Sequence, residues 1–262
     1  MRRVRSGLPA SPLVAALGRA AIAFIPVLAV AAGCTSMGFD RSALRDSIDF
    51  GPPEHVRLCV YLDDGLAPSD ATSLIDTWSG QARIFKLYVE PVSFQHMSRA
   101  AFFNSGILEQ VNSIPLGPSC DRMIYFVNRN AGDVAYGLAS IGLGLPEVLG
   151  EVDDPTLTHG YVVARRATVT QLLMSPSDVT EHELFHLLGC PDHFNMPGCY
   201  ERIHNLKLAE EKLKQDGYFK KVGEAPFYPT FASHTESMLL SRAQVNRYSR
   251  MESGPGSAAL VP

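Results

Sequence analysis

The chain is predicted to form an α/β domain around a mostly parallel sheet, because a strand, a helix and a second strand follow one another near its start. Residues 56–62 and 85–92 are apolar and rich in strand-forming side chains, and residues 69–83 between them have helical spacing. A third apolar strand is expected over residues 122–128. Strands connected through a helix pair in parallel and need a helical layer over the sheet.

The rest of the domain is predicted to hold one more strand, one loop and several helical segments. Residues 161–167 are β-rich and end in two arginines, which suits an edge strand open to water or to a bound peptide. Residues 135–152 contain many Gly and Leu without a clean period, so we expect a partly buried loop. The helical or amphipathic segments are 102–111, 177–188 with Asp178 near its N-cap, 201–215 with a charged, solvated face, and 242–251.

The N-terminal residues 1–33 have the order of a signal peptide, with a basic start, a mostly apolar stretch and small residues ahead of Cys34. The end of this segment resembles a bacterial lipobox, in which the cysteine is lipidated after cleavage. We therefore expect an exported protein that Cys34 anchors to a membrane of the cell envelope. An ordinary signal peptide or an uncleaved anchor is the alternative, because the apolar run approaches the roughly 20 residues that span a bilayer.

One globular domain is expected after this segment. Residues 34–54 have little apolar periodicity and end in Gly-Pro-Pro, as in a tether, residues 55–252 form the domain, and residues 253–262 form a loose tail. The net charge of −4 and pI near 6.1 give no basic field for a nucleic-acid backbone. Nucleic acid is therefore excluded as an expected partner.

Four cysteines remain when Cys34 is set aside, an even number in a compartment where disulfides persist. They predict two disulfide bonds, and buried free thiols are the alternative. Three pairings are possible, and a bridge between Cys190 and Cys199 would close a short loop. The candidates are Cys59, Cys120, Cys190 and Cys199.

The sequence His-Glu-Leu-Phe-His at 182–186 is typical of a metal site on a helix. Positions four apart share a helix face, so the imidazoles of His182 and His186 can reach one ion. Glu183 lies beside that ion, where it can take a proton from a metal-bound water. Chance gives roughly 0.01 such motifs in a chain of this kind, although two satisfied core histidines are the alternative.

Gly189 is placed to end this helix, because glycine adopts the left-handed conformation that turns the chain sharply back. The returning chain can then bring a third ligand to the ion. Asp192 follows His186 by six residues and His193 by seven. Neighbouring side chains in an extended turn point apart, so one of the two should bind and the other should not.

The pattern H-E-x-x-H-x-x-G with a following third ligand resembles the metzincin signature. The version with Asp third, here the residues from Gly189 to Phe194, is similar to snapalysin, a family of small secreted bacterial proteases. The resemblance implies a metzincin-like zincin fold, with a twisted mixed sheet, an antiparallel edge strand, an active-site helix and a C-terminal helix. It implies Zn²⁺ held by His182, His186 and Asp192 and a Met-turn at Met238, whereas the residues alone leave His193 as the alternative third ligand. The helical segment 200–232 would be an insertion.

The expected function is therefore zinc-dependent endopeptidase activity, with Glu183 as general base and a peptide or protein substrate paired to the edge strand. The alternative is an inactive zinc-binding lipoprotein of the envelope that acts as a binding module.

Overall fold

A computed structural model of the chain describes residues 41–100, 102–103, 106–116, 119–143, 148–165, 175–215, 217, 230–231 and 238–239. Within these ranges, no helix is both long and apolar enough to cross a bilayer. The predicted signal peptide with Cys34, the predicted helix 242–251 and the tail lie outside the described residues.

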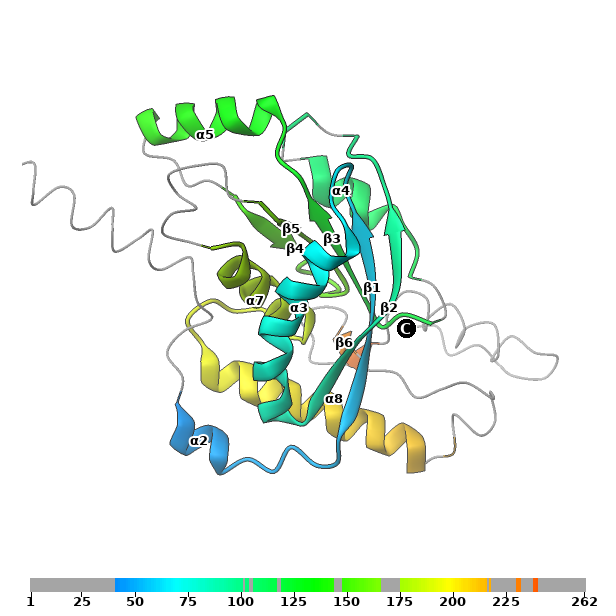
Figure 1. Ribbon diagram of the computed structural model, residues 1–262. Coiled ribbons are helices and arrows are strands. Elements are labelled where there is room, and N and C mark those ends of the chain that lie inside the picture. The colour runs from blue at the N-terminus through cyan, green and yellow to red at the C-terminus, as the bar shows by residue number, and fades with distance from the viewer. Residues whose placement is uncertain are drawn as a thin grey trace, which may run out of the picture. The chain divides into compact units, whose positions relative to one another are not determined.

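The main sheet has five strands in the order β2-β1-β3-β5-β4 (Figure 1). β1 pairs in parallel with β2 and β3, β3 pairs in parallel with β5, and β4 runs antiparallel to β5 at the edge. The predicted fold class, a mixed and mostly parallel sheet with an antiparallel edge strand, is confirmed. The strands are β1 (Glu54–Leu62), β2 (Leu87–His96), β3 (Arg122–Val127), β4 (Gly150–Val152) and β5 (His159–Val163).

Helices connect and cover these strands. After the short α2 (Ser42–Asp46), α3 begins where Pro68 fixes the first turn and the Asp70 carboxylate accepts a hydrogen bond from the Ala67 N–H at 2.9 Å. Helix α3 spans Pro68–Ala82, and a 3-10 turn η1 (Arg83–Phe85) follows it. The remaining helices are α4 (Ile107–Asn112), α5 (Ala131–Leu143), α7 (Pro176–Leu187) and α8 (Met196–Gln215). A small second sheet pairs β6 (Thr230–Phe231) with β7 (Met238–Leu239).

The pleat of the strands divides the core between the two faces of the sheet. On one face, alternate residues of β1, such as Val60, pack with apolar residues of α3, α7 and α8. The Trp78 ring of α3 meets the Phe185 ring of α7 edge-on at 6.4 Å. On the other face, Tyr125 of β3 and Tyr161 of β5 pack with apolar residues of α4. Helix α7 therefore lies on the face that carries the larger core cluster.

The edge strand lies elsewhere than the sequence predicts. β5 pairs with β3 on one side and β4 on the other, and all its residues are buried, so the prediction of an edge strand over 161–167 is wrong. Arg165 follows β5, where its exposed side chain donates to the Gly65 carbonyl. Residues 135–152 form most of α5 and all of β4 in place of the expected loop. Gly137 and Gly142 lie within α5, and glycine is unfavourable in a helix interior, so the composition favoured a loop.

The end of the predicted tether packs against the domain. The Phe50 ring is buried and meets the Phe85 ring edge-on at 5.2 Å. Nearby, the Arg41 N–H donates to the Tyr200 hydroxyl of α8 at 3.2 Å. Packing thus begins ahead of β1, inside the stretch 34–54.

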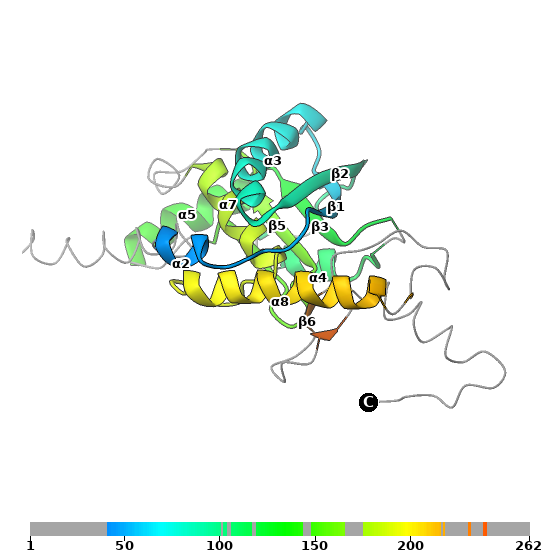
Figure 2. The same cartoon turned by 90° about the horizontal axis from the view of Figure 1, so that it is seen from below.

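The long helix α8 runs alongside the segment that leads from α2 to β1 (Figure 2). A cluster of ionisable side chains connects α8 to the start of β1. Glu54 of β1 and Glu210 of α8 are almost fully buried. The Lys214 ammonium donates to both Glu54 oxygens at 3.0 Å and lies 3.1 Å from Glu210. Burial raises the pKa of Glu210 to about 9, and the adjacent Glu54 carboxylate acts in the same direction. Glu210 is therefore protonated at neutral pH.

Replacing Glu210 by glutamine should stabilise the protein at alkaline pH. The folded-state pKa lies above the ordinary value of 4.5, so the native state holds its proton more tightly and its stability falls as the pH rises from about 4.5 through 9. Glu210→Gln cannot ionise, so its melting temperature should exceed that of the wild type by a few degrees near pH 9, and by little near about pH 5. Glu201→Gln, an exposed change on the same helix, should show no such pH-dependent gain in thermal melts.

Candidate metal centre

Helix α7 begins at a capping box that its sequence dictates. The Ser175 hydroxyl accepts a hydrogen bond from the Asp178 N–H at 3.2 Å, and the Asp178 carboxylate accepts one from the Ser175 N–H at 2.9 Å. Pro176 occupies the first helical position, where its missing N–H has no cost. The N-cap is thus Ser175, and Asp178 stands three residues inside the helix. This start fixes the register that places His182 and His186 on one face.

The chain reverses directly after α7. Gly189 has a φ of +102°, and a Cβ at this position would lie 2.5 Å from the Leu206 side chain of α8. The predicted role of Gly189 as the stop of the helix is therefore matched by its positive φ, and a Cβ at this position would also require the Leu206 side chain to shift. The reversal carries the chain from α7 back across the ligand face.

Two disulfides join the four candidate cysteines. Cys190–Cys199 connects the reversal to the first turn of α8, and its Cα atoms are 4.6 Å apart. Cys59–Cys120 connects β1 to the segment before β3. Of the three pairings that the sequence allows, this one closes the loop containing His193 into a covalent ring.

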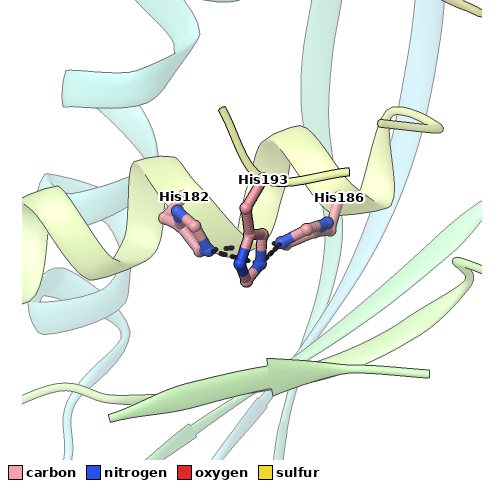
Figure 3. Close-up of side chains that lie close together, drawn as sticks. All are labelled: His182, His186 and His193. Carbon is pink, nitrogen blue, oxygen red and sulfur yellow. Dashed lines mark hydrogen bonds between the residues drawn. The ribbon is translucent and has the colours of Figure 1, made fainter. Parts of the chain in front are cut away.

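Three histidine side chains converge at the centre of this site (Figure 3). His182 and His186 project from α7, and His193 comes from the chain that returns after Gly189. The Nε2 atoms of His182 and His186 are 3.2 Å apart, and they lie 3.3 and 3.0 Å from the Nε2 atom of His193. Among the described residues, these three form the one group of His, Cys, Asp or Glu side chains able to hold a metal ion together.

The triangle of nitrogens has the size that zinc requires. Zn²⁺ binds imidazole nitrogen at about 2.0–2.1 Å in tetrahedral sites, which places two such nitrogens about 3.3–3.4 Å apart. The observed separations of 3.0 to 3.3 Å are close to that value. Three imidazoles also leave a fourth tetrahedral position for water or substrate, the arrangement of catalytic zinc sites.

The protonation of the imidazoles favours metal binding. Burial lowers the pKa of His182 to about 3, with His186 and His193 acting in the same direction, and burial also lowers the pKa of His186. Both rings are therefore neutral at neutral pH. Nδ1 of His186 lies 2.6 Å from the Cys190 carbonyl, which can only accept, so the proton is on Nδ1 and the Nε2 lone pair faces the centre. Lone pairs that converge in this way repel one another unless they share a cation.

The two residues that the sequence offers as third ligand are placed differently. His193 joins the pair on α7, whereas Asp192 is exposed and its carboxylate accepts from the Asn195 side chain at 3.4 Å. Phe194 adopts a φ of +60°, which is rare for an aromatic residue and turns the chain just after His193. Met238 stands in β7 opposite Phe231 of β6, and its side chain is outside the described part of the chain. Its role in a Met-turn stays a prediction.

Glu183 lies on α7 beside the first histidine and is almost fully buried. Its carboxyl packs against the backbone of Gly150 in β4, where a Cβ would lie 2.6 to 2.9 Å from three side-chain atoms of Glu183. Burial raises the pKa of Glu183 well above its ordinary value, and the carboxylates of Glu151 and Asp154 act in the same direction. A desolvated carboxyl of this kind is suited to proton transfer. Sequence reasoning missed Gly150, because only the sheet brings β4 to α7.

No protein-family model matches the chain, and no curated protein matches it. Among solved structures, archaemetzincin from Methanopyrus kandleri is similar over 53% of this chain and 73% of its own, with 17% sequence identity and a TM-score of 0.32.

A side chain at position 150 should displace Glu183 and destabilise the protein. The added methyl group of Gly150→Ala would overlap the Glu183 carboxyl, and we expect a loss of about 1–3 kcal/mol in the free energy of unfolding. Gly80→Ala is the matched control, because nothing lies within 4 Å of its Cβ on helix α3. That change should instead stabilise by roughly 0.5–1 kcal/mol. Chemical denaturation measures both, and a Gly150→Ala variant as stable as the wild type would contradict the contact.

Proposed function

We propose that the protein is a zinc-dependent endopeptidase whose metal is held by His182, His186 and His193 and whose general base is Glu183. The observation that carries the proposal is the convergence of three imidazoles at zinc spacing, beside a buried carboxyl on the helix that carries two of them. A site built only to hold a structural ion would use a fourth protein ligand, and the described residues supply three.

Zinc, when bound, supplies a Lewis acid that polarises the scissile carbonyl and brings the pKa of a water toward about 7. The chain supplies the base. The Glu183 carboxylate takes the proton from the attacking water and returns it to the nitrogen of the leaving amine. Its raised pKa favours the protonated form that the second transfer needs, and a cation nearby favours the carboxylate that the first transfer needs.

The edge strand β4 is the proposed binding surface for the substrate. In the main sheet β4 pairs with β5 on one side only, and both strands contact α7, the helix that carries His182 and His186. A peptide could add to this edge by main-chain hydrogen bonds. The proposed position of the substrate thus moves from 161–167 to β4. Anchoring of the enzyme to the cell envelope through Cys34 is a further part of the proposal, and the order of the N-terminal sequence supports it.

The role of Glu183 can be tested by comparing two glutamates of one helix. Glu183→Ala should bind zinc with nearly the wild-type affinity and lose peptidase activity by at least about 100-fold, because the base is gone and the ligands remain. Glu181→Gln, two residues away on the same helix, should keep wild-type activity. The assay is chelator-reversible cleavage of casein and a peptide library.

Zinc binding without hydrolysis by the wild type would overturn the endopeptidase proposal. It would favour the alternative, an inactive zinc-binding envelope lipoprotein that acts as a binding module. Absence of stoichiometric zinc would overturn both functions.

The third ligand can be tested with the adjacent pair. Loss of a residue that only supports a metal ligand raises the Kd by roughly 10- to 100-fold. His193→Ala removes a direct ligand, so it should raise the zinc Kd by at least that much. Asp192→Ala should leave the Kd close to that of the wild type, since the Asp192 side chain is exposed and paired to Asn195. Competition with a zinc-binding dye measures both. If Asp192→Ala lost zinc and His193→Ala kept it, the carboxylate would be the ligand.

A further inference from the structure

We infer that Arg122 is a positioning residue for the metal centre, because its guanidinium holds the C-terminal end of the ligand helix α7. The inference rests on the proposed function in that it concerns the same three histidines. Arg122 stands at the start of β3, distant in sequence from α7, and its side chain is fully buried. Its Nε donates to the Leu187 carbonyl at 2.5 Å.

The bond to Leu187 completes the hydrogen bonds of the helix end. The last four carbonyls of a helix lack the partners that its interior provides. In α7 the Leu188 N–H donates to the carbonyls of residues 184 and 185. The Phe185 carbonyl also accepts from the Cys190 N–H, and the His186 carbonyl accepts from the Gly189 N–H. The helical donor for the Leu187 carbonyl would be residue 191, which is a proline and has no N–H. Arg122 supplies the missing donor from the sheet.

A buried arginine is costly, so its contacts must compensate for lost hydration. Nη1 of Arg122 donates to the Asp121 carbonyl at 2.8 Å. The buried Asp121 carboxylate is itself held by Arg57, whose Nη2 lies 2.6 Å from Oδ1 and whose backbone N–H donates to Oδ2 at 2.8 Å. The guanidinium also faces the negative end of the α7 dipole, where a cation is stabilising. Arg122 is therefore fixed from the sheet side and can act as a rigid support.

The position of Leu187 explains why this support matters for the metal. Leu187 follows the ligand His186 directly and precedes the reversal at Gly189, which brings back His193. A shift of the Leu187 carbonyl would thus move two of the three ligands relative to His182, which lies a full turn earlier in α7. Second-layer contacts of this kind set the geometry of the ligands and hence the affinity of the site.

The experiment measures metal binding by full-length variants at Arg122. Arg122→Met removes every donor, Arg122→Gln keeps a neutral donor, and Arg122→Lys keeps a charged one. We expect the zinc Kd to rise by about 10- to 100-fold in Arg122→Met, and Arg122→Lys to recover part of the loss. The Co²⁺ absorption bands, which report the tetrahedral ligand geometry, should shift in Arg122→Met.

Met123→Ala is the matched control. Met123 is the next residue of β3, is also buried, and packs on the opposite face of the sheet. It should lower the melting temperature without changing the zinc Kd or the Co²⁺ spectrum, which separates positioning from general destabilisation.

Two outcomes would overturn the inference and leave the proposed function intact. One is an Arg122→Met variant with wild-type Kd and Co²⁺ spectrum. The other applies if Arg122→Met does not fold: Arg122→Gln and Arg122→Lys would then both bind zinc with the wild-type Kd. Failure of the wild type to bind zinc or Co²⁺ would instead overturn the proposed function.

Discussion

The sharp reversal of the chain at the end of α7 is the constraint on which the candidate site depends. A helix can present two imidazoles four residues apart, but a third ligand on the opposite side of the ion must come from a chain that turns back. Gly189 makes the turn with a φ of +102°, a conformation that strains residues with a side chain, and a Cβ there would also displace the Leu206 side chain. The Cys190 carbonyl, one residue on, accepts from the ring of His186. The residues that reverse the chain after α7 thus also hold the ring of the ligand His186.

Burial accounts for the shifted pKa values of the site through one physical effect. Removing water disfavours charge, so it lowers the pKa of His182 and His186 and raises that of Glu183. The result is a set of neutral imidazoles ready to bind a cation, beside a carboxyl able to carry a proton. The sheet contributes by shape, because Gly150 of β4 leaves space for the Glu183 side chain.

The parts of this protein that could be predicted from its sequence are those that local pattern determines. Apolar periodicity placed β1, α3 and α7 nearly at their observed bounds, and helical spacing brought His182 and His186 together. Pairing between distant segments could not be predicted in this way. Whether a strand lies inside a sheet or at its edge depends on its partners, so β5 was wrongly predicted to be an edge strand. The chain also turns just after His193 through a positive φ at Phe194, which aromatic residues rarely adopt and which the sequence therefore does not predict.

The covalent ring closed by Cys190–Cys199 has a consequence for when the site can assemble. Within this ring, His193 is held near the first turn of α8 even before the surrounding residues have settled. A newly made chain with free thiols lacks that restraint and must order the loop against its full conformational entropy. Maturation of the ligand set is thus linked to oxidation. Reduction of the Cys190–Cys199 bond should therefore loosen the loop that holds His193 at the other two histidines.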